Sequence, residues 1–198
     1  MTNPIPTKSN LLAAKRSRDL AQTGSSLMDQ KQAILSRELL SHIEQVNSLQ
    51  SQMECAYQKA YSALQRANIA LGQCENWAET VEEDQSLSLH YRSVMGLELP
   101  ILTANHEAPF APPYGFTGTD SSLDEALLRF AQVKALIRAF AERENTVYRL
   151  AQALGKSRKR ARALDRVIIP RLDAAIRQME EILAQRELEE LSRQKALK

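Results

Sequence analysis

The chain has 198 residues, of which 25% are charged and only 5% are aromatic, and its formal net charge is +2. Ala, Leu, Glu, Lys and Arg make up almost half of it, which is typical of long helices and coiled coils rather than of a compact globular domain. Its longest apolar runs have about four residues, so we expect neither a membrane-spanning helix nor a secretory signal.

Residues 1–84 are predicted to form one long helical arm. Pro4 and Pro6 precede it, so the helix should begin between Thr7 and Asn10. Two apolar rows with heptad spacing follow: Leu39, Val46, Met53, Ala60, Ala67, Cys74 and Val81 in one, and Ile43, Tyr57, Leu64, Leu71 and Ala78 in the other. Alanines recur between positions 56 and 70, and we expect them to let the arm approach a partner helix closely, near Ala131, Ala135 and Ala139.

The two cysteines, Cys55 and Cys74, would lie about 28 Å apart on one helix, too far for a disulfide. Reduced cysteines of this kind fit a cytosolic protein.

A central region, residues 85–121, differs from the arms. Leu87–Val94 and Leu97–Leu102 alternate apolar and polar residues around Gly96, which predicts two short strands, with Pro100 restricting the second to an edge. A loop rich in Pro and Gly follows and carries three aromatic residues, Phe110, Tyr114 and Phe116. These aromatics are expected to close a small cluster against the end of the arms, and a partner-docking patch is the alternative.

Residues 122–198 are predicted to form the second helical arm. Ser122 and Glu125 have the spacing of a capping box, so this helix should begin near Ser122. Pro170 interrupts it and should bend it. One heptad row comprises Ala126, Val133, Phe140, Val147, Leu154, Ala161, Ile168, Ala175 and Ile182, and a companion row comprises Phe130, Ile137, Leu150, Leu164, Leu172 and Met179.

Together these elements predict a fold dominated by α-helices: a long antiparallel two-helix coiled-coil hairpin with a small central β-hairpin. Each arm of about 70 residues would be roughly 105 Å long.

Charge is distributed unevenly along the chain. Residues 75–125 carry a net charge of −9, and Glu79, Glu82 and Glu83 in this acidic run are candidate partner contacts. Residues 126–198 carry +8, concentrated in a basic cluster of seven residues: Lys156, Arg158, Lys159, Arg160, Arg162, Arg166 and Arg171. In the predicted hairpin this cluster would face residues 31–46, which could not neutralise it. A solvated helix face, an acidic protein partner and nucleic acid are its possible roles, although no interleaved aromatics favour the last.

No catalytic or ligand-binding constellation stands out. Gly155-Lys156-Ser157 matches the end of a phosphate loop, but Leu150 stands where the first glycine should be and no strand precedes it. His42, His90 and His106 lack the spacing of metal ligands. We therefore expect no enzyme activity, cofactor or metal in this chain.

Three segments, in order along almost the whole chain, resemble the D subunit of V-type ATPases of the bacterial and archaeal type. The first is Pro6–Leu12, the second is Val94–Pro100, and the third is Arg158–Lys198 with its Ala163–Asp165 and Val167–Leu172 stretches.

The resemblance implies a central rotor shaft without an active site. Its paired terminal helices would enter a catalytic hexamer of A and B subunits, the small F subunit of the stalk would bind it, and its other end would dock on a cap subunit above the membrane ring. It would turn as ATP is hydrolysed or synthesised, coupled to H⁺ or Na⁺ translocation, and would lie in the cytoplasm, peripheral to the membrane. The alternative is a cytosolic coiled-coil adaptor or scaffold, or a nucleic-acid-binding protein with basic arms.

Overall fold

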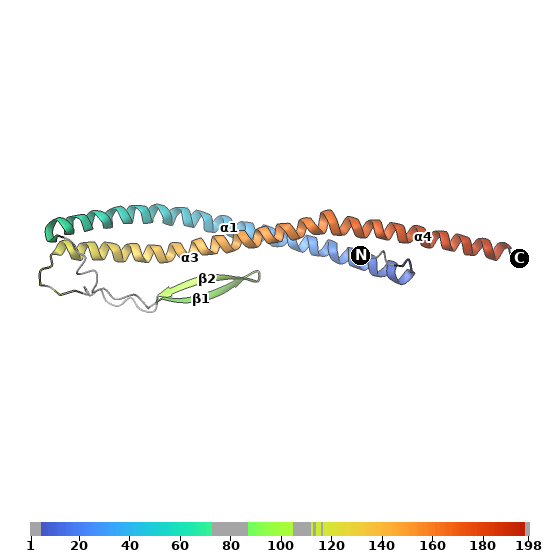
Figure 1. Cartoon of the computed structure of the whole chain (residues 1–198), viewed down its shortest axis with the longest axis horizontal. Coiled ribbons are helices and arrows are strands. Elements are labelled where there is room, and N and C mark those ends of the chain that lie inside the picture. Colours follow the sequence, from blue (N-terminus) through green and yellow to red (C-terminus); the bar gives the residue numbers. More distant parts are fainter. Residues whose placement is uncertain (1–4, 73–86, 105–111, 113, 116, 197–198) are drawn as a thin grey trace. The chain divides into compact units, whose positions relative to one another are not determined.

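The computed structural model describes residues 5–72, 87–104, 112, 114–115 and 117–196. The chain divides into two compact units, one formed by Met1–Ser36 with Ala153–Lys198 and the other by Arg37–Gln152. The fold class predicted from the sequence is confirmed: two long helical segments pack together and a two-stranded antiparallel hairpin lies between them in the sequence (Figure 1). No helix of the described residues is long and apolar enough to span a membrane.

Helix α1, Lys8–Leu71, begins where the prolines predicted and has no break at Gly24. Thr7 caps it, since the backbone N–H of Asn10 donates to Thr7 Oγ1 at 3.2 Å. It ends at Leu71 because Gly72, with φ of 82°, adopts the left-handed conformation that terminates many helices. Cys74, Ala78, Val81 and the predicted arm boundary at residue 84 lie outside the described residues.

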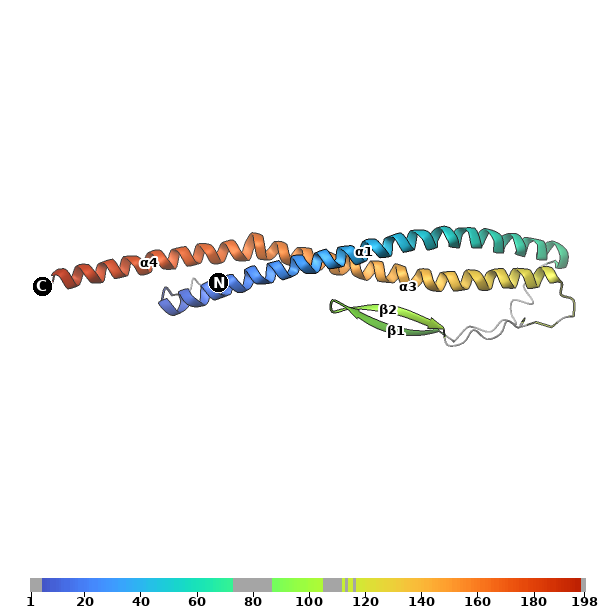
Figure 2. The ribbon, with the colours of Figure 1, turned by 180° about the vertical axis from the view of Figure 1, so that it is seen from behind.

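In the second unit, α1 runs antiparallel to α3, Ser121–Ala163, as both views show (Figure 2). Ala60, Ala63 and Ala67 are buried on the seam and Ala56 is half-buried, which confirms that small residues line it, whereas the predicted Ala70 is exposed. Their partners were wrongly predicted, because Ala131, Ala135 and Ala139 are exposed. The facing residues lie nearer the start of α3: Tyr61 packs edge-to-face on Phe130, and Arg66 pairs with Glu125 at 3.2 Å.

Asp120, rather than the predicted Ser122, caps α3. Its Oδ1 accepts from the Ser121 backbone N–H at 2.7 Å and its Oδ2 accepts from Ser122 Oγ at 3.2 Å. Glu125 is therefore available for its ion pair with the facing helix. Tyr114 is buried against Ala67 and Leu123, as predicted for the loop aromatics, whereas Phe110 and Phe116 lie outside the described residues.

The two predicted strands are confirmed as β1, Leu87–Val94, and β2, Leu97–Ala104. They pair in register from Leu87↔Ala104 to Val94↔Leu97, joined by the two-residue turn Met95-Gly96. Both turn residues have positive φ, 52° and 73°, as a type I′ turn requires.

Two side chains of α3 hold the outer edge of β2. Glu142 Oε2 accepts a hydrogen bond from the Leu102 backbone N–H at 3.0 Å, and Arg149 donates to the Glu98 carbonyl at 2.9 Å. The Arg149 guanidinium also lies 5.5 Å from the centre of the Tyr91 ring. Because an isolated two-stranded hairpin is marginally stable in water, these contacts are what positions the hairpin on α3.

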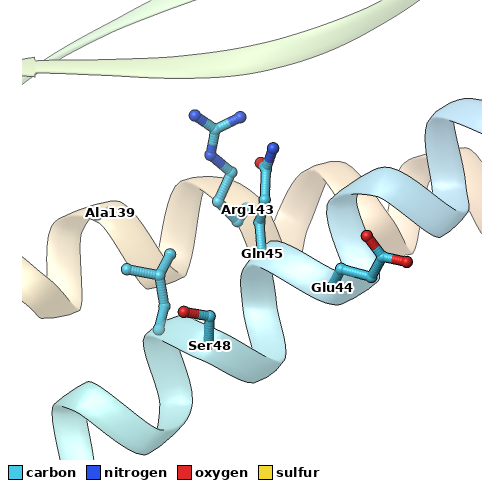
Figure 3. Close-up of a pocket in the computed structure, with 6 residues that line it drawn as sticks. Glu44, Gln45, Ser48, Ala139 and Arg143 are labelled. Carbon is cyan, nitrogen blue, oxygen red and sulfur yellow. The ribbon is translucent and has the colours of Figure 1, made fainter.

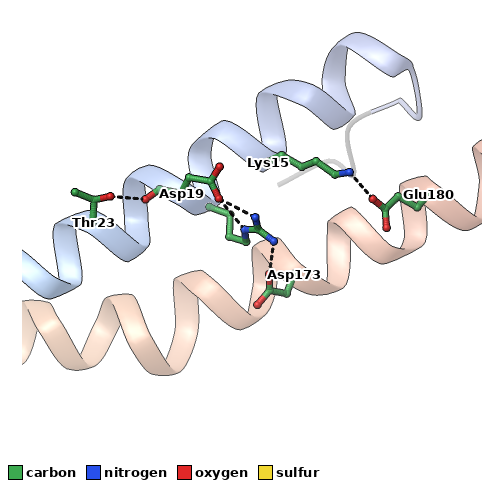
Figure 4. Close-up of polar contacts among 6 residues, drawn as sticks. Lys15, Asp19, Thr23, Asp173 and Glu180 are labelled. Carbon is green, nitrogen blue, oxygen red and sulfur yellow. Dashed lines mark hydrogen bonds and ion pairs between the residues drawn. The ribbon is translucent and has the colours of Figure 1, made fainter.

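In the first unit, the start of α1 runs antiparallel to the end of α3, the π-helical turn η1, Leu164–Ile168, and α4, Ile169–Ala196. Ion pairs join α1 to α4 at Lys8–Glu187 (2.9 Å), Lys15–Glu180 (2.7 Å) and Arg18–Asp173 (4.0 Å). The last two are drawn in Figure 4, where Asp19 also accepts from Arg18.

The interruption predicted at Pro170 takes the form of this π-helical turn. Proline cannot donate to the carbonyl four residues earlier, and just before it the backbone N–H of Ile169 bonds to the Leu164 carbonyl, five residues back. The turn also shifts the seam. Ile168, predicted to be in the heptad row, is 41% exposed, while Ile176 and Met179 are buried.

Candidate functional site

The basic cluster occupies the last turns of α3, the π-helical turn and the start of α4. The buried residues of this stretch are Leu154, Ser157 and Ala161, and they form its side of the helix seam. The charged side chains therefore lie on the other faces of the helix. The structure brings the seven predicted residues onto one continuous segment, and all of them are exposed: Lys156, Arg158, Lys159, Arg160, Arg162, Arg166 and Arg171.

The segment that faces the basic cluster was wrongly predicted as residues 31–46. Ser25 Oγ donates to Asp165 Oδ1 at 2.5 Å, and Ser157 Oγ lies 3.8 Å from Met28 Sδ. These contacts place residues 24–28, Gly-Ser-Ser-Leu-Met, which carry no charge, opposite residues 157–165. The error arose because heptad rows define which face of a helix is buried but not how far the two helices are offset along their axes.

The cluster keeps most of its charge available to a partner. Among the described residues, none of the ion pairs involves six of its members: Arg158, Lys159, Arg160, Arg162, Arg166 and Arg171. Five cations within nine residues of one helical segment produce a positive potential that attracts acidic surfaces and is screened by salt. The second set of predicted contacts, Glu79, Glu82 and Glu83, lies outside the described residues.

The Gly155-Lys156-Ser157 stretch is an uninterrupted part of α3, as expected from the heptad that runs through it. Its backbone N–H groups are committed to the helix, and the Ser157 side chain is only 4% exposed and directed at Met28. It therefore lacks the loop of open backbone donors that a phosphate site needs. The described residues contain no group of three or more His, Cys, Asp or Glu side chains that could hold a metal.

A groove of about 480 Å³ lies between α1 and α3 in the second unit and was not anticipated from the sequence. Four of its six lining residues have polar or charged side chains, although apolar atoms make up most of the lining surface: Glu44, Gln45, Ser48, Leu49, Ala139 and Arg143. Figure 3 shows Arg143 and Gln45 extending to the same side, while Glu44 points away from them.

His42, two residues before this groove on α1, is buried at 6% exposure, and its Nδ1 has no hydrogen-bond partner among the described residues. Burial lowers its pKa, and the nearby Arg143 cation lowers it further. We therefore expect the stability of this unit to depend on pH.

Comparison with known proteins gives a consistent result over the whole chain. Residues 10–198 match the family model described as the D subunit of ATP synthase. The chain is 37% identical to the V-type ATP synthase D subunit of Thermotoga neapolitana, over 98% of this chain and 96% of the relative. It is 32% identical to the A-type ATP synthase D subunit of Methanosphaera stadtmanae, over 98% and 92%, and 30% identical to that of Thermococcus kodakarensis, over 100% and 94%. The chain therefore belongs to the family of ATP synthase D subunits.

Proposed function

We propose that this chain is the central rotor shaft of a V/A-type rotary ATPase. It would couple ATP hydrolysis or synthesis in a catalytic head of A and B subunits to H⁺ or Na⁺ translocation by a membrane ring. The small F subunit of the stalk and a membrane-side cap subunit would be its other partners, and the chain would remain peripheral to the membrane on the cytoplasmic side. It would contribute no catalytic residues of its own.

The observation that carries this proposal is the match to D-subunit relatives along almost the entire length of both chains. The structure adds a mechanical argument within each unit. Paired antiparallel helices with buried residues at alternating three- and four-residue steps resist bending and twisting better than single helices. Such a pair suits an element that must transmit torque.

The charge distribution supplies the proposed contacts. The exposed basic cluster, from Lys156 to Arg171, would attract an acidic surface of the head or of the F subunit. The acidic run that contains Glu79, Glu82 and Glu83 would bind a basic surface on the cap subunit. Opposite charges on these two segments would let them bind different partners.

Vesicles that contain the complete complex test the proposal. With this chain present, ATP should drive ion uptake, and an inhibitor of the membrane ring should slow hydrolysis. Complexes assembled without the chain should hydrolyse ATP without ion uptake or ring-inhibitor sensitivity. Full ATP-driven uptake in its absence would rule out the shaft role, and a reconstituted complex with the chain restored is the matched control.

A further inference from the structure

The two helices of the first unit do not have the same seam pattern. On α1, buried and half-buried residues alternate at steps of three and four without interruption: Leu11, Ala14, Arg18, Ala21, Ser25, Met28, Gln32 and Leu35. On the opposite side the same alternation is broken once, by a step of five from Leu164 to Ile169. The four residues between them are all exposed, and all four belong to the π-helical turn.

Beyond this turn, one apolar stripe of α4 contains its most buried residues. Ile176 and Met179 are 5% and 4% exposed, and Ile169, Leu172 and Leu183 are half-buried. Ala175 and Ile182 lie at the edge of this stripe and are half-buried as well. The π-helical turn contains the extra residue that rotates this stripe toward α1.

The sequence provides a second apolar stripe on α4. If the helix continued from Ala161 without the π-helical turn, the seam would pass through Ile168, Leu172, Ala175, Met179 and Ile182. The two stripes share Leu172 and Met179, and at 100° per residue their centres differ by roughly 60° of rotation about the helix axis. Both stripes are wholly apolar. The free energy gained by burying one or the other therefore differs mainly by one position, which is Ile176 in the first stripe and Ala175 in the second.

Two features favour the stripe that is buried here. Pro170 has no N–H to donate to the Arg166 carbonyl, which disfavours a continuous α-helix at this point. The Ser25–Asp165 hydrogen bond holds the first turn of the π-helical segment against α1. Further along α4, the helix-to-helix ion pairs are made by long, exposed side chains, which adjust to a small rotation at little cost.

We propose that the π-helical turn Leu164–Ile168 is a two-register switch that allows α4 to rotate against α1 between the two apolar stripes. Pro170 biases it toward the π-helical register. The inference concerns the chain by itself and is independent of the proposed function.

Disulfide trapping in the full-length chain tests this switch. The ion pairs at Lys15 and Arg18 place the neighbouring seam residue Ala14 opposite this part of α4. In a chain with Cys55→Ser and Cys74→Ser, Ala14→Cys is combined in turn with Ile176→Cys, with Ala175→Cys, or with Ala174→Cys, an exposed control position. Non-reducing electrophoresis of the oxidised monomer gives the trapped fraction, and circular dichroism checks that each variant stays helical.

The switch predicts that the 14–176 pair gives the largest trapped fraction when Pro170 is present. It also predicts that Pro170→Ala raises the ratio of the 14–175 to the 14–176 trapped fraction several-fold. Deletion of Val167 together with Pro170→Ala restores an unbroken alternation through Ile169 and Ile176, so it should trap only the 14–176 pair. The proposal is overturned if the trapped fraction of only one pair exceeds that of the 14–174 control, both with Pro170 present and after Pro170→Ala. It is also overturned if Pro170→Ala leaves the ratio of the 14–175 to the 14–176 trapped fraction unchanged.

Discussion

Ser25 and Asp165 lie 140 residues apart in the sequence and are joined by a hydrogen bond of 2.5 Å across the helix pair. Ser25 is 5% exposed and lies on the α1 seam, while Asp165 is the second residue of the π-helical turn. This contact sets the offset between the two helices at the point where the C-terminal segment departs from regular α-helix.

Ser25→Ala should therefore destabilise the free subunit by about 1–2 kcal/mol, because a hydrogen bond to a carboxylate is lost in a partly buried place. Ser26→Ala is the matched control, since Ser26 is exposed and adjacent; it should change the free energy of unfolding by less than about 0.5 kcal/mol. Urea denaturation measures both. Equal effects of the two substitutions would show that the Ser25–Asp165 contact contributes nothing.

The stability of the second unit should fall as the pH drops below neutrality. Because burial and then Arg143 lower the pKa of His42 from 6.5, the unfolded chain binds a proton in a range where the folded chain does not. The contribution of neutral His42 to the free energy of unfolding is fully present above pH 6.5, the usual pKa of histidine. It is lost as the pH falls toward the folded-state pKa, by up to about 1.4 kcal/mol per unit of pKa difference. Glu38 and Gln45 act in the opposite direction and limit the shift.

His42→Leu tests this pH dependence through urea denaturation between about pH 7.5 and pH 5, a range that spans the usual pKa of histidine. The variant should show a smaller loss of stability over that range, and its unfolding free energy at the upper end should not fall, because the unpartnered Nδ1 is removed. Arg143→Gln should reduce the same slope by removing the cation that lowers the His42 pKa most. A slope unchanged in both variants would contradict the role assigned to His42.

The exposed basic cluster should contribute to assembly through its charge. Arg158→Gln, Arg160→Gln and Arg162→Gln together should weaken binding of the chain to the catalytic head or the F subunit, most clearly at low salt where screening is least. Helicity should be unchanged, since Gln forms helices well. The matched control replaces the same three residues by Lys, which retains the charge and should restore most of the binding. Wild-type affinity of the Gln variant at low salt would mean that the cluster is only a solvated face.

The end of α4 should contribute little to the stability of the free subunit. The Lys8 and Glu187 side chains are 80% and 59% exposed, and Leu188 and Leu191 are also exposed. Deleting residues 184–198 should lower the melting temperature by no more than a few degrees, because exposed ion pairs and frayed ends stabilise weakly. In the assembled complex the same deletion should reduce the coupled ATPase rate. A large loss of stability with normal coupling would assign the segment a purely structural role.

The sequence predicts the elements of this fold well because their signals are local. After Val94, the alternation resumes at Leu97, and Gly96 supplies one of the two positive φ values that the turn requires. The start of α1 near Lys8 follows equally from Pro4 and Pro6.

How far the long helices are shifted along their axes, and which face of each is buried, are not local properties. Here the sequence led to wrong predictions. Both stripes of α4 are apolar, so periodicity favours Ile168 as strongly as Ile169, and only the π-helical turn decides between them. The Glu142 and Arg149 contacts to the β2 edge are likewise invisible in the sequence, because ordinary exposed helix positions carry the same residues.

The shaft role is tested most directly by observing the chain during ATP hydrolysis. Tyr148, 67% exposed on α3, is replaced by a biotinylated cysteine in a chain with Cys55→Ser and Cys74→Ser, and the catalytic head of the assembled complex is fixed to a surface. A bead attached to this cysteine should rotate continuously in one direction when ATP is added and stop when ATP is withdrawn. A bead that stays stationary while the same immobilised complexes hydrolyse ATP would contradict the account.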